Sequence, residues 1–267
     1  MFPHYRGKYT KRPSVGPQYF VRNMKSRLPD TAILVYSSKI RNEINKILGS
    51  TQIASYEDKM FSSLGIYLNK EKSFVMVYLP IGAPITGIAT EELIARGVRR
   101  FLIIGFAGSL NDDIEHGNIV VCTKSIRDEG VSHHYARGSV YAYPTKEFTM
   151  SIVKIMRKNG IEFRAGPSWT MDAPYMETVD EIRHYGKKGV LTVEMESAAL
   201  FAIVDSYRKR RMKVEAGAIF IISDIVTKDI KDYEFIDTKE RFNKYSVGDR
   251  VKEIAAVIRD LKKMQIR

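Results

Sequence analysis

Short, fully apolar runs alternate with amphipathic stretches along this chain, and that alternation limits the fold more than any other feature. The run 101–104 is apolar at every position, as expected of a strand covered on both faces of a sheet. Further strands are predicted at 32–36, 62–68, 73–79, 118–127, 190–193 and 216–222, and helices at 39–48, 90–96, 146–158, 178–185, 197–207 and 238–263. The pattern predicts one α/β domain with a mixed sheet flanked by helices.

The composition is consistent with one domain that has a sizeable core. The chain has 267 residues, of which 44% are hydrophobic. We expect the domain to cover 30–267 and residues 1–29, which contain several prolines and basic residues, to form an irregular N-terminal arm. No long apolar run or secretory leader is recognisable, and Cys122 is the only cysteine. We therefore expect no membrane span, no internal disulfide and a cytoplasmic location.

The positive charge is concentrated in two segments. The net charge is +12, from 43 Lys and Arg residues and 31 Asp and Glu residues. The arm and the segment 208–213 carry much of the excess. Such segments can bind nucleic acid or attract anionic substrates, or they can be a solvated tail and a basic helix end. We favour the second alternative, and we expect no nucleic-acid partner, because no aromatic residues are interleaved in the manner of RNA-binding modules.

Two glutamates stand at a predicted strand-to-helix junction. Glu194 and Glu196, separated by Met195, follow the apolar run 190–193 and precede the helix 197–207. A carboxylate held at a strand end can accept two hydrogen bonds from a vicinal diol such as that of ribose. The alternative is that both are ordinary acids at a helix start, where the helix dipole favours negative charge.

The segment 194–201, Glu-Met-Glu-Ser-Ala-Ala-Leu-Phe, resembles the ribose-binding motif of the nucleoside phosphorylase family, which includes purine nucleoside and uridine phosphorylases and related nucleosidases. Segments 105–110, 127–135, 166–175 and 222–224 resemble other motifs of that family in the same order, and 127–135 and 166–175 are similar to its uridine-phosphorylase-like branch. The resemblance implies a nucleoside phosphorylase-type fold, pentosyl transfer from a nucleoside to phosphate, and no cofactor. It also implies a homo-oligomer, because members of the family complete each site with residues of a neighbour.

The resemblance also implies roles for individual residues. Glu196 would anchor the ribose diol, Met195 would lie on the ribose face, and Glu194 would serve the base or the turn. Asp224, if burial keeps it protonated, would donate a proton to the N7 atom of a purine. The alternative for Asp224 is a helix N-cap.

The segment 166–175 supplies the predicted base-binding residues. Trp169 or Tyr175 would stack on the base, and Thr170 or Asp172 would bind its edge. The alternative for Trp169 is that it packs a loop onto the core. His133 and His134 are adjacent, so one helical face cannot present both to a metal, and we expect no metal site.

The phosphate site departs from the family pattern. Members usually have a Gly-Asp-Pro turn and then Arg after the first strand, whereas residues 36–41 read Tyr-Ser-Ser-Lys-Ile-Arg. The resemblance implies that Arg41 and Gly105 bind phosphate. However, Ile103 and Phe106 stand where the family usually has Arg and Thr or Ser, and we expect them to line an apolar pocket.

Three functions follow from this pattern. The first is a uridine-phosphorylase-like enzyme with a rebuilt phosphate site. The second is a nucleoside hydrolase, and the third is a non-catalytic nucleoside-binding protein or partner subunit. The base also stays open, because 166–175 is similar to the uridine branch whereas Asp224 suits purine chemistry.

Overall fold

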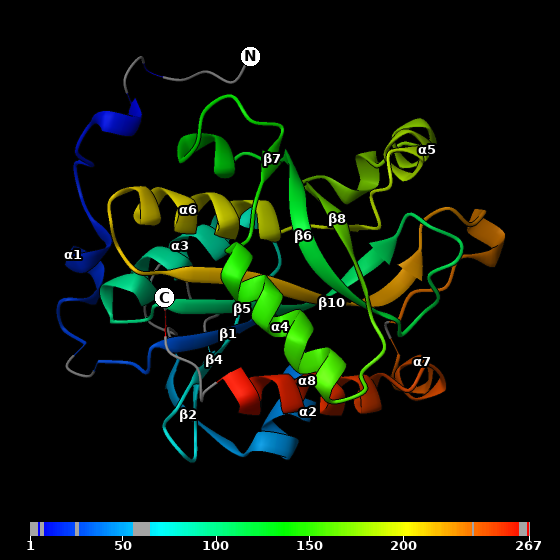
Figure 1. The fold of residues 1–267 in the computed structure, drawn as a ribbon, viewed down its shortest axis with the longest axis horizontal. Helices are drawn as coiled ribbons and strands as arrows, with labels where there is room; N and C mark the ends of the chain where they lie inside the picture. The colour runs from blue at the N-terminus through cyan, green and yellow to red at the C-terminus, as the bar shows by residue number, and fades with distance from the viewer. Residues whose placement is uncertain are drawn as a thin grey trace.

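The central strand β5 (Arg100–Ser109) organises a large mixed sheet in the computed structural model, which describes residues 5, 8–24, 27–55, 65–236, 238–261 and 266 (Figure 1). It pairs in parallel with β1 (Thr31–Val35) along its first half and with β10 (Glu215–Ile225) along its whole length. The last two residues of β5 pair antiparallel with β9 (Thr192–Glu194). A mixed sheet inside an α/β fold is what the sequence predicted, and the prediction is confirmed.

Half of the sheet closes on itself. β10 pairs with β6 (Ile119–Asp128), β6 with β8 (Arg164–Met171), and β8 with β9, which returns to β5. β7 (Tyr141–Ala142) adds a short pairing to β6. On the other side of β5, the sheet continues through β1, β4 (Val75–Tyr78), β3 (Gly65–Asn69) and β2 (Ser50–Ser55). The strands that carry the predicted functional motifs lie in or beside the closed half.

Helices cover both faces of the sheet, as Figure 1 shows. α3 (Ala83–Ala95) and α6 (Ser197–Lys209) bury one face, against Phe101 and Ile103 of β5. α2 (Ser38–Leu48), α4 (Lys146–Lys158) and α8 (Val247–Leu261) bury the other, against Leu102 and Ile104. Successive strand residues point to opposite faces, so a run that is apolar at every position supplies both cores. α5 (Val179–Lys187) covers a third, smaller core around Trp169.

Three local expectations were wrong. The segment 105–110 resembles the glycine turn of the family, and we expected a turn there, but 105–109 is the second half of β5, because β10 pairs with β5 as far as Ser109. The segment 164–171 is the strand β8, part of which we expected to be a loop. The helix expected over 238–263 is divided into α7 (Lys239–Lys244) and α8 at Ser246, whose φ of 51° lies in the left-handed region. The predicted residues 62–64 and 262–263 lie outside the described part of the chain.

The described part of the N-terminal arm is more ordered in structure than the sequence suggested. It contains the 3-10 turn η1 (Lys8–Thr10) and the short helix α1 (Pro17–Val21), which contacts α3. The Tyr9 hydroxyl donates a hydrogen bond of 2.7 Å to the backbone oxygen of His133. The arm therefore lies along the body of the protein at both of these points. Within the described residues, no helix is long and apolar enough to cross a membrane.

Candidate functional site

Several polar side chains, including the predicted Glu196 and Asp224, lie where the parallel strands β1, β4, β5 and β10 end. Tyr36 follows β1, Gly82 precedes α3 after β4, and Asp224 lies near the end of β10. β9 brings Glu194 to the same edge, because Val193 pairs with Gly108 of β5. In open α/β sheets, ligands bind outside the carboxyl ends of the strands, so this edge is the candidate site.

Glu194 is fully engaged by the protein itself. One carboxylate oxygen accepts hydrogen bonds from the hydroxyls of Ser168, Thr170 and Ser197, at 3.2, 2.5 and 2.6 Å. The other accepts the backbone N–H groups of Glu196 and Ser197, each at 2.8 Å. Burial raises the pKa of Glu194, although these hydrogen bonds oppose the shift. The sequence left open whether Glu194 binds the base or stabilises the turn into α6. This arrangement supports the second role, because both carboxylate oxygens are bound by groups of the protein itself.

Glu196 is buried but keeps acceptor capacity. Its side chain is 6% exposed, and it accepts the backbone N–H of Gly82 at 2.7 Å and that of Met195 at 3.3 Å. Burial, and after it the negative charge of Glu194, raise the pKa of Glu196 to about 8. Above this pKa the ionised carboxylate offers about four lone-pair positions, so two remain for donors from a ligand.

Tyr36 and Thr86 connect β1 with the start of α3 beside Glu196. The Thr86 hydroxyl donates to the backbone oxygen of Gly82 at 3.0 Å, so the Tyr36 hydroxyl is the donor in their mutual hydrogen bond of 2.9 Å. Burial and the charge of Glu196 raise the pKa of Tyr36. Neither contact was predicted from the sequence, and the only signal was that Tyr36 is the last residue of the predicted strand 32–36.

Asp224 occupies the other side of the site, within β10. It is 6% exposed, and its two oxygens accept hydrogen bonds from the hydroxyls of Ser223, at 2.6 Å, and Tyr233, at 2.8 Å. The pairing register of β10 shifts between Ile222 and Asp224, and such a bulge re-aims side chains. The helix N-cap alternative for Asp224 is wrong, because the residue belongs to a strand.

Gly108 lies under Asp224 and needs to be glycine. A Cβ atom there would come within 2.8 Å of Val226 and 3.1 Å of the Asp224 carboxylate. Gly105, which the resemblance implied for phosphate binding, has ordinary space around it, since the nearest atoms would be 3.8 Å away, in Ile103 and Tyr36. The glycine that the geometry requires is therefore Gly108.

Glu177 joins the Asp224 side from the segment that follows the 3-10 turn η3 (Pro174–Met176). Burial, and then the negative charges of Asp224 and Glu181, raise the pKa of Glu177 to about 7. Burial and Asp224 likewise raise the pKa of Tyr233, which is 39% exposed. No motif in the sequence pointed to Glu177 or Tyr233.

The four predicted base-binding residues are not gathered at one point. Trp169 is 0% exposed, donates its indole N–H to Asp128 at 2.9 Å and lies 4.8 Å from the ring of Tyr185. Its ring has no free face for a base, which corresponds to the alternative that Trp169 packs the core. Thr170 is also buried, and its hydroxyl binds Glu194.

Asp172 and Tyr175 lie further out. The Asp172 carboxylate accepts the backbone N–H of Gly130 at 2.9 Å, and its charge contributes to the raised pKa of Glu196. Tyr175 is fully exposed. Of the four, only Asp172 is both exposed and near Glu196. Among the described residues, no group of three or more His, Cys, Asp or Glu side chains is arranged to hold a metal ion.

The predicted phosphate residues lie in different surroundings. Arg41 is in the first turn of α2, and its guanidinium group lies 4.6 Å from the centre of the Tyr78 ring. Ile103 is 0% exposed and belongs to the core under α3 and α6, and Phe106 packs against the opposite core. The expectation that Ile103 lines an apolar anion pocket is therefore wrong, because its side chain points into the core.

Comparison with known proteins identifies the class. Residues 18–258 match the model of the Phosphorylase superfamily, and the chain belongs to this family. It is 35% identical to a guanosine phosphorylase of Halorubrum lacusprofundi over 139 residues, which cover 52% of this chain and 56% of that relative. It is 29% identical to the uridine phosphorylase of Haemophilus influenzae over 204 residues, which cover 71% of this chain and 80% of that relative.

Solved structures show the same fold. A uridine phosphorylase from Vibrio fischeri superposes with a TM-score of 0.71 at 21% identity, covering 90% of this chain and 97% of the other. A purine nucleoside phosphorylase from Toxoplasma gondii in complex with immucillin-H gives a TM-score of 0.75 at 16% identity, covering 89% and 93%. The nucleoside phosphorylase-type fold that the sequence predicted is confirmed.

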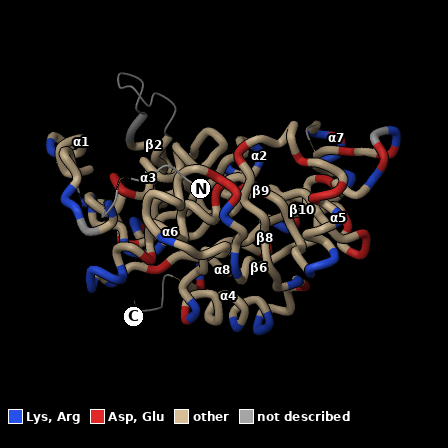
Figure 2. Tube along the Cα trace, turned by 90° about the horizontal axis from the view of Figure 1, so that it is seen from above, with Lys and Arg blue, Asp and Glu red and all other residues tan. Residues whose placement is uncertain are grey.

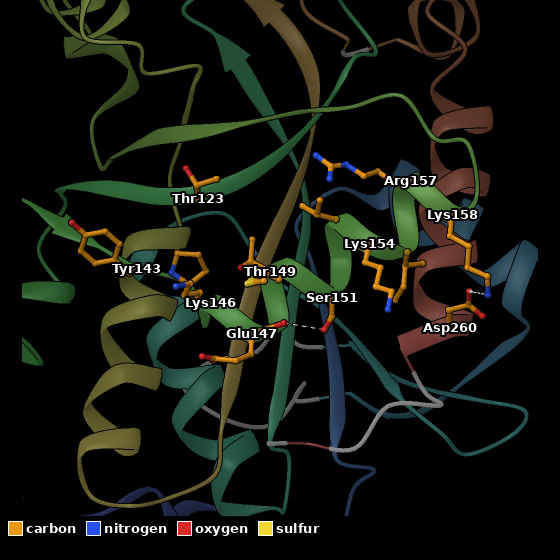
Figure 3. Close-up of a pocket in the computed structure, with 14 residues that line it drawn as sticks. Thr123, Tyr143, Lys146, Glu147, Thr149, Ser151, Lys154, Arg157, Lys158 and Asp260 are labelled. Carbon is orange, nitrogen blue, oxygen red and sulfur yellow. Dashed lines mark hydrogen bonds and ion pairs between the residues drawn. The ribbon is translucent and has the colours of Figure 1, made fainter.

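A large hollow elsewhere does not belong to this site. A cavity of about 1300 Å³ lies along α4 and is lined by Tyr143, Met150, Lys154 and Arg157 among others. Figure 3 shows several of the lining side chains, Lys154 and Arg157 among them. None of the residues described above lines this cavity. The candidate site is thus defined by its polar side chains at the strand ends, not by the size of a cavity.

Proposed function

We propose that this protein is a uridine-phosphorylase-like nucleoside phosphorylase, which transfers the pentosyl group of a nucleoside to phosphate. The observation that carries the proposal is the arrangement of Glu194 and Glu196. The Glu194 carboxylate accepts hydrogen bonds from the protein on both oxygens, whereas the Glu196 carboxylate can accept further hydrogen bonds from a ligand. The names of the relatives support a phosphorylase over the hydrolase and the non-catalytic alternatives.

The ribose would lie against Glu196. Its 2′ and 3′ hydroxyls would donate to the carboxylate, and Met195, which is partly buried, would contact the sugar face. Glu194 would act as a positioning residue, because it fixes the backbone N–H groups of Glu196 and Ser197. The anchored sugar then presents its C1′ atom, where the bond to the base breaks and the bond to a phosphate oxygen forms.

The base would lie on the Asp224 side. Cleavage leaves negative charge on the base, which a proton donor can neutralise. Asp224 is the proposed acid, and Tyr233 and Glu177 are the polar groups that surround it. Asp172 and Tyr175 are proposed at the entrance, where Asp172 could bind a base edge.

Phosphate would bind beside β1. Arg41, with Gly105, remains the proposed phosphate residue from the family resemblance. Lys39 is a second cation in the same helical turn, and its amino group reaches the backbone oxygen of Ile236 at 3.3 Å. The amino end of α2 favours anions through the helix dipole. These features support phosphate use without the turn that the family usually has.

A single assay tests the proposal. Uridine, adenosine, inosine and guanosine are incubated with and without phosphate, and free base is measured. We expect phosphate-dependent release of base, with uridine among the substrates. Release without phosphate would support the hydrolase, and nucleoside binding without any release would support the non-catalytic protein.

We also propose a homo-oligomer. Family members complete each site with residues of a neighbour, and Tyr175, which the resemblance places at the base, is fully exposed in the isolated chain. Light scattering at micromolar concentration should give a mass above that of one 30.5 kDa chain. A purely monomeric, active protein would contradict this proposal.

A further inference from the structure

Two basic segments that the proposed catalysis does not use meet across one groove. Part of the arm and the end of α6 face each other beside α3 and the 3-10 turn η2 (Ser132–His134), and they enclose about 1270 Å³. Figure 2 shows Lys and Arg residues gathered at the end of the molecule that carries α1. The charged residues that line the groove are Lys8, Lys11, Arg12, Arg137, Lys209 and Arg210, against Glu91 and Glu92.

The positive charge of this arm groove is only partly cancelled by its neighbours. Glu91 accepts a hydrogen bond from the Tyr207 hydroxyl, and Lys209 forms an ion pair with Asp205 at 2.6 Å. Within the described part of the chain, no carboxylate forms an ion pair with Lys11, Arg12, Arg137 or Arg210. A cleft lined by one sign of charge concentrates ligands of the opposite sign.

Aromatic and apolar side chains accompany the cations. The Arg137 guanidinium lies 5.1 Å from the centre of the Tyr9 ring, and that of Arg210 lies 5.7 Å from the centre of the Tyr207 ring. A guanidinium that rests on a ring keeps its N–H groups available for phosphate oxygens. Phe20 also lines the groove and is 48% exposed, so it offers a face on which a flat ring can stack.

The wall that the arm contributes is fixed in place. The hydroxyl of Tyr9 binds the backbone oxygen of His133, the amino group of Lys8 is hydrogen-bonded to the His134 ring, and α1 contacts α3. The groove is also separate from the nucleoside site. Pro84, Gly87 and Ile88 of α3 line it, whereas Thr86 of the same helix is hydrogen-bonded to Tyr36.

We propose that the arm groove binds a nucleotide, that is, a small molecule with a flat ring and two or more phosphates, separately from the nucleoside site. Several cations around one hollow suit a polyphosphate, and the aromatic rings suit a base. The arm encloses the groove on one side, which favours a small ligand over a long nucleic acid.

Calorimetry on the full chain tests the proposal, with ATP as the probe and tripolyphosphate as the comparison. We expect saturable ATP binding that is at least about fivefold tighter than that of tripolyphosphate, because a base stacked on an aromatic ring adds to the affinity. Equal affinity for ATP and tripolyphosphate would show that the base is not recognised and would contradict the proposal. Absence of saturation at millimolar ATP would also overturn it.

A matched pair of double variants locates the site. Arg137→Gln with Arg210→Gln removes two exposed cations of the groove, and Lys154→Gln with Arg157→Gln removes two exposed cations of the cavity in Figure 3. Losing charge-assisted contacts should weaken ATP binding about 10- to 100-fold in the first variant. The second should stay within about twofold, because only long-range charge is lost. Equal losses would show unspecific attraction and contradict the proposal.

Glu196→Gln separates the two sites. ATP affinity should be unchanged in this variant, because Glu196 does not line the arm groove. If Glu196→Gln weakens ATP and the Arg137 and Arg210 changes do not, the nucleotide occupies the nucleoside site and the proposal is wrong. An RNA oligonucleotide that binds more tightly than ATP would also overturn it, in favour of a nucleic-acid surface. Failure of the base-release assay would leave these outcomes unaffected.

Discussion

The ribose side and the base side of the candidate site are built differently. On the ribose side, Glu194 accepts five hydrogen bonds from buried groups of β8 and of the turn into α6. On the base side, Asp224 depends on its neighbour Ser223 and on Tyr233, a partly exposed residue of the segment after β10. The side chains around Glu194 therefore belong to the rigid core. We expect substitutions around Asp224 to affect the stability of the fold less than substitutions around Glu194.

The largest effect that this contrast predicts comes from Glu194→Ala. Five buried donors would lose their acceptor, and an uncompensated buried donor costs about 1–3 kcal/mol. With partial rearrangement, we expect the free energy of unfolding to fall by about 3–5 kcal/mol, a range typical of breaking a buried charged cluster. Urea unfolding measures it. Asp224→Ala, which removes the acceptor of only two donors, is the comparison, and an equal loss of unfolding free energy in both variants would contradict the difference between the two sides.

A second prediction concerns pH. Because the pKa of Glu196 is raised from 4.5 to about 8 in the folded protein, the native state binds more protons than the unfolded chain between these values. The contribution of Glu196 to the free energy of unfolding is therefore full below pH 4.5 and is lost as the pH rises through 8. Glu177 changes the free energy of unfolding in the same direction up to about pH 7. We expect unfolding free energy to fall by roughly 2–4 kcal/mol between pH 5 and pH 9. Glu196→Gln should flatten the profile, and a wild-type stability that rises over this range would contradict the assignment.

Glu196→Gln should weaken nucleoside binding by about 10- to 100-fold while leaving the fold intact. Above pH 8, where Glu196 is ionised, the diol donates to a charged acceptor in the ground state, and such a bond contributes about 1.5–3 kcal/mol. Asp224→Asn should instead reduce kcat more than affinity, since an acid acts mainly in the transition state. Calorimetry and steady-state kinetics on both variants separate these effects. Equal nucleoside affinity in wild type and Glu196→Gln would disprove the diol anchor.

Tyr233→Phe should have the smallest effect. It removes one hydrogen bond to Asp224, worth about 0.5–1.5 kcal/mol, so kcat/KM should change by roughly two- to tenfold. The unfolding midpoint should be nearly unchanged, because the hydroxyl belongs to a partly exposed side chain. Tyr143→Phe, on an exposed ring away from the site, is the matched control. A large loss of stability in Tyr233→Phe would contradict this prediction and would show that the segment after β10 contributes to the rigid core.

The sequence predicted the elements of the fold well because their signals are local. The apolar run 101–104 is visible in four residues, and the predicted end of the helix 39–48 coincides with the cap of α2 at Gly49, whose φ is 61°. The whole of strand β8 was missed, because its exposed start and its proline do not give an alternating pattern.

The site was only partly predictable, for a physical reason. The motif around Glu196 is contiguous, so a resemblance could identify it. The partners of Glu196 and Asp224 are Gly82 and Tyr233, which come from distant segments and are brought in by the tertiary fold. Trp169 shows the opposite error: a single aromatic residue in a motif suggested a base platform, but its burial can be known only from how β8 and α5 pack.

One residue of β5 determines how far apart the two sides stand. Gly108 is paired with Val193 of β9 on one edge and with Asp224 of β10 on the other. Neighbouring strands are about 4.8 Å apart, so the sugar-side and base-side strands are held about 10 Å from each other. The spacing of the strands therefore sets the distance between the group that binds the sugar and the group that binds the base. A change of substrate specificity therefore has to come from side chains that lie between β9 and β10. The distance between these two strands cannot increase unless their hydrogen bonds to β5 are broken.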